Sequence, residues 1–281
     1  MTPAEPTPFT VGDGLAIRGE TAGEGAPIVL CHGLTATRRS VVHGSRALER
    51  AGRRVVSYDA RGHGESDPSP AGEGYGYPKL VGDLEAVVAA EAGEGPLVLV
   101  GSSMGAHTAV AYALRDRERP AGLVLIGPVY DGSLDESDLA YWDGLAAVLE
   151  TGGVGGFVDC IDRQGIDPAW RNSVLRFTRE RMLRHRHLDA VAEALRQVPR
   201  SRPFEGLDEL ESLQVPALVV ASHDDSDPGH PRAVAEAYAE HLLLARVVGE
   251  QERESPLAWQ GGRLSREIAG FCAELENRAD R

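Results

Sequence analysis

Short apolar runs alternate along the chain with longer segments in which apolar positions recur at helical spacing. The apolar runs predict strands at residues 15–18, 28–31, 55–58, 97–100, 123–126, 217–221 and 245–248. Several runs are apolar throughout, which is typical of strands covered on both faces. Helices are expected between them at residues 40–51, 79–92, 105–117, 232–243 and 263–276. The alternation predicts an α/β fold with a mostly parallel central sheet flanked by helices.

One interval breaks this alternation and is helical throughout, with amphipathic stretches at residues 138–150, 168–184 and 188–198. It lies between two predicted strands of the sheet. We therefore expect an inserted helical lid at residues 131–205, within a core formed by residues 1–130 and 206–281. Such a lid would shape a pocket over the strand ends, where ligands bind in open α/β sheets.

Composition narrows the classes of partner. The 281 residues carry a formal net charge of −14, which disfavours nucleic acid and anionic membranes as partners. The N-terminus has no basic segment followed by an apolar one, so no secretory signal is expected. Cys31, Cys160 and Cys272 are too widely spaced to predict a disulfide framework or a zinc site. We expect a cytoplasmic protein without a metal or cofactor, and the sequence leaves its oligomeric state open.

The chemistry-bearing motif is GSSMG at residues 101–105, which follows a predicted strand and precedes a predicted helix. This is the G-x-S-x-G pattern of a nucleophile elbow, in which a sharp turn exposes a serine hydroxyl above the sheet. The helix that begins after Ser103 directs free N–H groups and a positive dipole end toward developing negative charge. The motif and its context predict that Ser103 is an activated nucleophile.

Two further motifs accompany the elbow. A strand closes on CHGL at residues 31–34, and another is followed by DARGHGES at residues 59–66. In this order the three motifs resemble the α/β-hydrolase superfamily, over roughly residues 10–130 and 206–275. The resemblance implies an α/β-hydrolase fold and an oxyanion hole formed by the backbone N–H groups of Leu34 and Met104. It also implies that His32 and His63 shape loops.

The resemblance further implies the chain order serine, acid, histidine. The acid should follow the strand at residues 217–221, where SHDDSDP contains Asp224, Asp225 and Asp227. Counting from the strand end favours Asp225, whereas an Asp-Pro-x-x-Pro pattern fits Asp227. We favour Asp225 and keep Asp227 as the alternative; one of these carboxylates could instead cap the next helix.

The histidine is the departure from the family pattern. No histidine follows the last predicted strand, and the last one in the chain is His241. Three replacements are conceivable. His230 lies on the loop after the acid strand, at the same sheet edge as the elbow. His107 lies four residues after Ser103 on the elbow helix, where packing inside the core is the plainer interpretation. A carboxylate, Glu252 or Glu254, would need burial to raise its pKa before it could act as a base.

The predicted lid also contains a basic helix. Its arginines could bind a carboxylate or phosphate of a substrate, but their spread around the helix favours a solvated surface. These residues are Arg171, Arg176, Arg179, Arg181 and Arg184.

The favoured hypothesis is a hydrolase of a small ester, lactone or thioester, with Ser103 as nucleophile, His230 as base and Asp225 or Asp227 as acid. Without a base, a serine hydroxyl is a poor nucleophile near neutral pH. The missing C-terminal histidine therefore keeps two alternatives open. One is a lyase, a cyclase or a biosynthetic helper that uses the same pocket, and the other is a binding protein without catalysis. In each case the expected partner is a small molecule.

Overall fold

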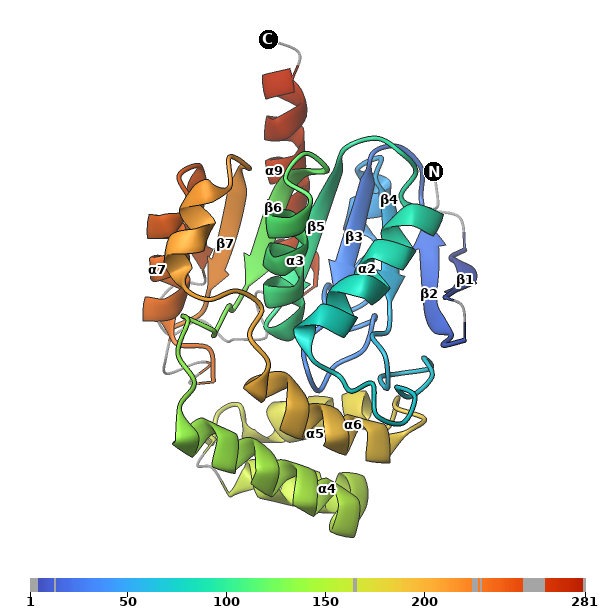
Figure 1. Ribbon diagram of the computed structural model, residues 1–281, viewed down its shortest axis with the longest axis vertical. Coiled ribbons are helices and arrows are strands. Elements are labelled where there is room, and N and C mark those ends of the chain that lie inside the picture. Colours follow the sequence, from blue (N-terminus) through green and yellow to red (C-terminus); the bar gives the residue numbers. More distant parts are fainter. Residues whose placement is uncertain are drawn as a thin grey trace.

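The computed structural model describes residues 5–12, 14–163, 166–223, 227, 229–249 and 261–279. Its described strands form one sheet in the order β1-β2-β4-β3-β5-β6-β7-β8 (Figure 1). The first two are antiparallel to their neighbours and the pairs from β4 to β8 are parallel. The strands are β1 (Thr7–Val11), β2 (Ile17–Ala22), β3 (Pro27–Cys31), β4 (Arg54–Tyr58), β5 (Leu97–Ser102), β6 (Pro120–Ile126), β7 (Ala217–Ala221) and β8 (Ala245–Gly249).

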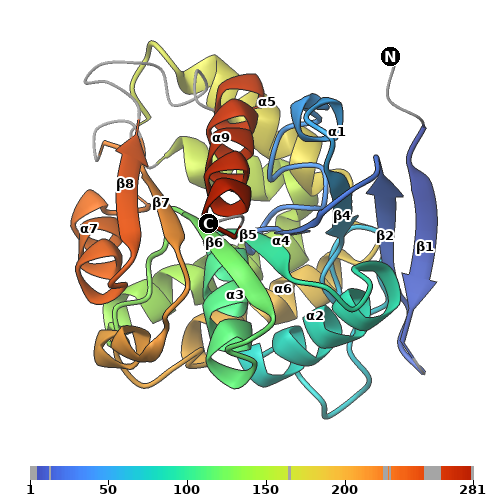
Figure 2. The same cartoon turned by 90° about the horizontal axis from the view of Figure 1, so that it is seen from above.

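Helices cover both faces of the sheet (Figure 2). One face carries α2 (Tyr77–Glu91), α3 (Met104–Arg115) and α7 (Arg232–His241), and the other carries α1 (Ala47–Arg50) and α9 (Gly262–Ala279). Each layer encloses its own cluster of buried apolar side chains. Because both faces are covered, the central strands consist almost entirely of buried residues, as their apolar runs predict.

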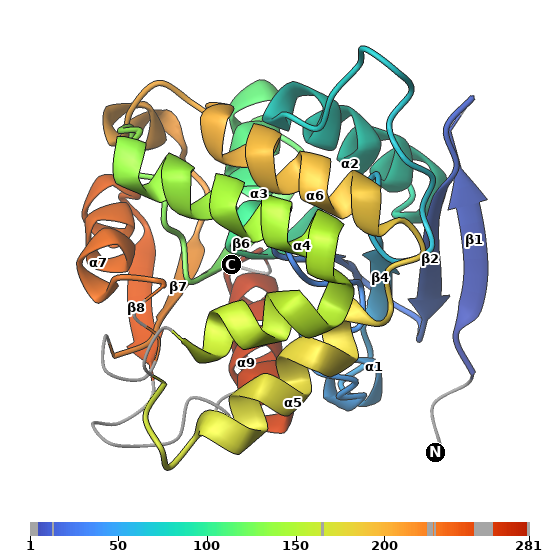
Figure 3. The ribbon, with the colours of Figure 1, turned by 90° about the horizontal axis from the view of Figure 1, so that it is seen from below.

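Between β6 and β7 the chain forms a helical insertion that lies below the carboxyl ends of the parallel strands (Figures 1 and 3). It contains α4 (Glu136–Asp162), α5 (Arg171–Met182) and α6 (Leu188–Gln197), followed by the short 3-10 helices η1 (Val198–Arg200) and η2 (Leu207–Ser212). By length and composition alone, α4 could span a membrane. In the structure it kinks at Gly153 (φ 56°) and packs against α5 and α6.

The predicted sheet and most predicted helices are confirmed, with three departures. The strand predicted at residues 15–18 lies instead at Ile17–Ala22, whose sequence IRGETA is not an apolar run. The sequence does not predict the strand β1, because its residues, TPFTV, include two threonines and a proline and form no apolar run. In the structure this strand is mostly exposed. The helix predicted at residues 40–51 is wrong over most of its length, since only Ala47–Arg50 is helical. The preceding residues form turns in which His43 and Gly44 have positive φ (46° and 72°), a conformation that ends a helix.

Candidate active site

The predicted elbow is present between β5 and α3. Ser103 has φ 50° and ψ −114°, a left-handed φ that a non-glycine residue adopts only under strain. The flanking glycines make room for this turn. A Cβ on Gly105 would collide with the carbonyl oxygen of Cys31, and one on Gly101 would collide with the carbonyl oxygen of Gly105. The motif therefore folds as its residue types demand, with Ser103 at the carboxyl end of a central strand.

The loop that follows β3 lies directly against this turn. An ideal Cβ on Gly33 would stand 3.6 Å from Ser103 Cβ and 3.4 Å from the carbonyl oxygen of Ser102. The residues predicted to form the oxyanion hole, Leu34 and Met104, therefore flank Ser103 and are both buried. Within the described residues, neither backbone N–H has a hydrogen-bond acceptor. Both groups can thus donate to a ligand atom beside Ser103.

Three histidine rings face consecutive carbonyl oxygens of residues 33–35. His32 accepts a hydrogen bond at Nε2 from the backbone of Ala60 (2.9 Å), so its Nδ1 carries the proton and donates to residue 33 (2.8 Å). His63 Nε2 lies 2.7 Å from the carbonyl oxygen of residue 34, and His185 Nε2 lies 3.4 Å from that of residue 35. Burial lowers the pKa of His32 to about 4, which keeps that ring neutral. The loop-shaping interpretation of His32 and His63 agrees with these contacts.

His185, which the sequence did not single out, belongs to the helical insertion. It accepts a hydrogen bond at Nδ1 from the backbone of Gly64 (2.9 Å), and the backbone of Arg186 donates to the carbonyl oxygen of Gly64 (2.9 Å). The end of α5 is thereby attached to the loops after β3 and β4. Sequence spacing carries no signal for this contact, because His185 and Gly64 are 121 positions apart.

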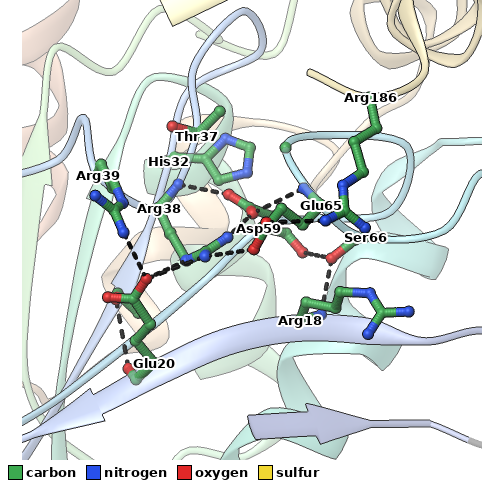
Figure 4. A network of polar contacts seen from close by, with 12 residues as sticks. Arg18, Glu20, His32, Thr37, Arg38, Arg39, Asp59, Glu65, Ser66 and Arg186 are labelled. Carbon is green, nitrogen blue, oxygen red and sulfur yellow. Dashed lines mark hydrogen bonds and ion pairs between the residues drawn. The ribbon is translucent and has the colours of Figure 1, made fainter. Parts of the chain in front are cut away.

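A buried carboxylate fixes the same loops from the sheet side (Figure 4). Asp59 has no exposed surface and accepts hydrogen bonds from the backbone of Arg38 (2.8 Å), the backbone of Glu65 (3.1 Å) and the Arg38 guanidinium. Arg38 also donates to Glu65 (2.7 Å), which pairs with Arg186 of the insertion (3.2 Å). Since a buried carboxylate is stable only when paired and hydrogen-bonded, this network holds the loops in one arrangement.

The candidate base is held by one of the candidate acids. His230 Nδ1 lies 2.8 Å from Asp227 Oδ2, and the two side chains are about one-third exposed (30% and 41%). Desolvation lowers the pKa of His230, but the charge and hydrogen bond of Asp227 outweigh it and the net pKa is raised. Desolvation likewise raises the pKa of Asp227, and the partner ring reverses this to a net decrease. In the described part of the chain, His230 Nε2 has no hydrogen-bond partner and is free to accept a proton.

The same ring packs beside the elbow. The backbone N–H of Ser103 donates to the carbonyl oxygen of Ile126 (2.9 Å). The next residue, Gly127, touches His230 so closely that an ideal Cβ would stand 3.1 Å from Cγ and Cδ2 of the ring. With standard bond lengths, these links place the ring within about 10 Å of the Ser103 nitrogen. Ser103 Oγ makes no hydrogen bond to any described residue, the His230 ring included.

His107 is excluded as the base by its contacts. Its Nε2 accepts from the backbone N–H groups of Val129 (3.0 Å) and Tyr130 (3.1 Å), so Nδ1 carries the proton and donates to the Tyr77 hydroxyl (2.8 Å). Burial, and next the neighbouring His230, lower the pKa of this ring to about 3. Both nitrogens are therefore occupied and the ring stays neutral. The core interpretation of His107 is correct.

The remaining candidates lie outside the described residues. These are the favoured acid Asp225, its neighbour Asp224, and the carboxylates Glu252 and Glu254.

Known proteins that are similar to this chain include hydrolases. The family described as serine aminopeptidase, S33 (Hydrolase_4) matches residues 24–151. A 2-hydroxy-6-oxononadienedioate/2-hydroxy-6-oxononatrienedioate hydrolase of Pseudomonas putida is 30% identical over 216 residues, which cover 72% of this chain and 73% of that protein. The chain belongs to the α/β-hydrolase superfamily. The eight described strands form a mostly parallel sheet, and this sheet with its flanking helices is the α/β-hydrolase fold.

Other α/β hydrolases match over shorter or more divergent stretches. The sn-1-specific diacylglycerol lipase ABHD11 of Mus musculus is 37% identical over 100 residues, and the match spans 31% of that lipase and 35% of this chain. A thermophilic esterase from Thermogutta terrifontis superposes with a TM-score of 0.80 at 22% identity, covering 97% of this chain and 99% of that one. An enol-lactonase from Burkholderia xenovorans LB400 has a TM-score of 0.71 at 20% identity and covers 95% and 99%. At these identities the structural matches establish the fold.

Proposed function

We propose that the protein hydrolyses a small carboxylic ester, lactone or thioester, with Ser103 as nucleophile, His230 as general base and Asp227 as the acid that orients it. The observation that carries this proposal is the 2.8 Å hydrogen bond between His230 and Asp227, on a ring that packs against Gly127 beside the elbow. The named activities of similar proteins, which include a lipase, an esterase and a lactonase, support hydrolysis of an ester or a lactone.

In the first half of the proposed reaction, His230 Nε2 takes the proton of Ser103 as the hydroxyl oxygen attacks the substrate carbonyl. Asp227 accepts from Nδ1 and stabilises the imidazolium that forms. The carbonyl oxygen becomes an oxyanion and accepts hydrogen bonds from the N–H groups of Leu34 and Met104. His230 then gives its proton to the departing oxygen or sulfur, which leaves an acyl-enzyme on Ser103.

In the second half, water attacks the acyl-enzyme after losing a proton to His230, and the same two N–H groups stabilise the second oxyanion. Collapse releases the carboxylic acid and returns the proton to Ser103. For this sequence Ser103 Oγ must come within hydrogen-bond reach of His230, and such contacts often tighten only when substrate is bound. The helical insertion serves in this proposal as the lid, because it lies over the carboxyl ends of the strands.

The test compares four proteins for labelling by a fluorophosphonate probe and for hydrolysis of p-nitrophenyl acetate: wild type, Ser103→Ala, His230→Asn and His241→Asn. His241 is a matched control because it also pairs with a carboxylate, Glu211 (3.0 Å), but lies at the last residue of α7, whereas His230 precedes that helix. We expect loss of labelling in Ser103→Ala and at least about a 100-fold loss of turnover in His230→Asn.

Wild-type protein that labels no better than Ser103→Ala would end the proposal. If His230→Asn were as active as His241→Asn, Ser103 would remain the nucleophile but another group would have to be its base.

A further inference from the structure

One arginine of the helical insertion differs from the others. Arg181 lies on α5 half-buried, and its Nε is fully buried without a hydrogen-bond acceptor. It makes no hydrogen bond or ion pair to any described residue. Other arginines of this helix are accounted for, since Arg171 pairs with Asp162, Arg176 stacks on the ring of Phe177 and Arg179 is exposed. The sequence predicts solvated arginines along this helix, and Arg181 differs from that prediction because it is partly buried.

The helix face that carries Arg181 is turned toward the site. Thr178 and Met182 are buried, and Arg181, three residues after Thr178, lies beside them on the buried side of the helix. His185 reaches the carbonyl oxygen of Thr35, next to the predicted oxyanion hole. Arg181 precedes His185 by four residues, across the end of α5 at Met182. After burial and the neighbouring rings of His63 and His32, the charge of Arg181 also lowers the pKa of His185, so the guanidinium lies near this contact with the loop after β3.

The electrostatics place Arg181 near the other side of the site as well. After the larger effects of desolvation and of the pair itself, its charge lowers the pKa of Asp227 and of His230. Asp227 is already committed to His230 at 2.8 Å, so it does not neutralise the guanidinium by a direct pair. Burial lowers the pKa of Arg181 too, yet an arginine keeps its proton in proteins. The Nε of Arg181 is therefore buried without an acceptor on a side chain that is only partly buried, an unfavourable arrangement that a ligand would complete.

We infer that Arg181 binds a carboxylate of the substrate. The enzyme then prefers esters that carry a carboxylate group at a position remote from the scissile bond. This inference rests on the proposed function, since it assigns the substrate class of the same site. A guanidinium matches a carboxylate because its parallel N–H groups can donate to both oxygens at once. A doubly charged phosphate would call for more positive charge than this single guanidinium supplies.

The test uses two esters with the same acyl chain, mono(4-nitrophenyl) adipate and its methyl ester, in which a methyl group replaces the negative charge of the free carboxylate. The ratio of kcat/KM for the charged ester to kcat/KM for the neutral ester is measured in wild type, Arg181→Gln, Arg181→Lys and Arg179→Gln. Arg179→Gln is the matched control, because it removes the same charge from the exposed side of the same helix. Thermal unfolding followed by circular dichroism checks that each variant is folded.

We expect wild type to favour the charged ester and Arg181→Gln to lower the ratio about 10- to 100-fold, as loss of hydrogen bonds to a charged group predicts. Arg181→Lys should fall between them because lysine keeps the charge without the planar fork. Arg179→Gln should keep the wild-type ratio. A wild-type ratio near one, or equal ratios in Arg181→Gln and Arg179→Gln, would overturn the inference and leave the proposed function standing. Should Arg181→Gln fail to fold, the wild-type ratio and Arg181→Lys decide.

If wild type hydrolyses neither ester in a Ser103-dependent manner, the proposed function fails and binding alone is tested. Calorimetric titration with monomethyl adipate and dimethyl adipate then decides. Binding of the monoanion by wild type that is lost in Arg181→Gln supports the anion site, and absence of such binding overturns it.

Discussion

Replacing Gly127 by alanine should move the candidate base without altering any group of the proposed triad. Gly127 has φ 53°, and an ideal Cβ there would stand 3.1 to 3.2 Å from three carbon atoms of His230. Such contacts are tighter than van der Waals packing, so the ring must shift by a few tenths of an ångström. An L-residue in left-handed backbone costs about 1–2 kcal/mol, which corresponds to a decrease in Tm of roughly 2–8 °C.

The effect on catalysis follows from the shift of the ring. A misplacement of about 1 Å can cost roughly 100-fold in rate, so a smaller one should cost about three- to tenfold in kcat/KM. Gly72→Ala is the matched control. Gly72 has φ 85° and is exposed, and no atom lies within 4 Å of its ideal Cβ. It should lose similar stability through the same backbone strain but retain kcat/KM per folded molecule.

The assay pairs thermal unfolding with Ser103-dependent ester hydrolysis, with each rate divided by the folded fraction. The decisive quantity is the difference in kcat/KM between Gly127→Ala and Gly72→Ala. If the two variants lose equal stability and equal activity, displacement of His230 has no catalytic consequence. The assignment of His230 as the base would then be refuted.

Three other predictions follow from the same geometry. Because the pKa of His230 is raised, kcat/KM should increase with pH, with a midpoint above 6.5. Asp227→Asn should move that midpoint to lower pH, and an unchanged pH–rate profile in this variant would contradict the pairing. The corresponding stabilisation is present below pH 6.5 and is lost as the pH rises through the folded-state pKa of His230. His107→Ala should lower the free energy of unfolding by about 2–4 kcal/mol in urea titrations, since it leaves buried polar partners unpaired; a loss below about 1 kcal/mol would contradict its core role. Iodoacetamide should modify the half-exposed Cys160 before Cys31 and Cys272, because burial raises the pKa values of these two thiols to about 12 and about 11. Mass spectrometry of the labelled peptides measures the order, and earlier labelling of Cys31 or Cys272 would contradict the prediction.

The sequence predicts the sheet well because its signal is local. Apolar runs bounded by turns identify the strands from β3 to β8, and Gly101 of the elbow is required by a collision with the nearby carbonyl oxygen of Gly105. The exposed strand β1 has no such run. It is extended because it pairs with β2, not because of its own residues. Tertiary pairing overrides weak local preference in such edge strands.

The site is only partly predictable, since its contacts join distant positions. Position along the chain suggests His230 as a base, but its hydrogen bond to Asp227 rather than another carboxylate depends on the loop conformation. The contact of His185 with the loop after β3 depends on how the helical insertion packs. The tautomer of His107 follows from three hydrogen-bond partners that the sequence does not place beside it.

The position of the helical insertion has a consequence for the order in which activity arises. The elbow and the loop after β3 belong to strands that end by Ile126, whereas β7 and the His230 loop come only after roughly 90 further residues. Synthesis runs from the N-terminus, so Ser103 and the strands beside it are made before the candidate base His230. Until β7 is made, Ser103 lacks the base that the proposed function assigns to it. In the proposed function, pairing of β7 with β6 would be the step that brings the candidate base His230 to Ser103.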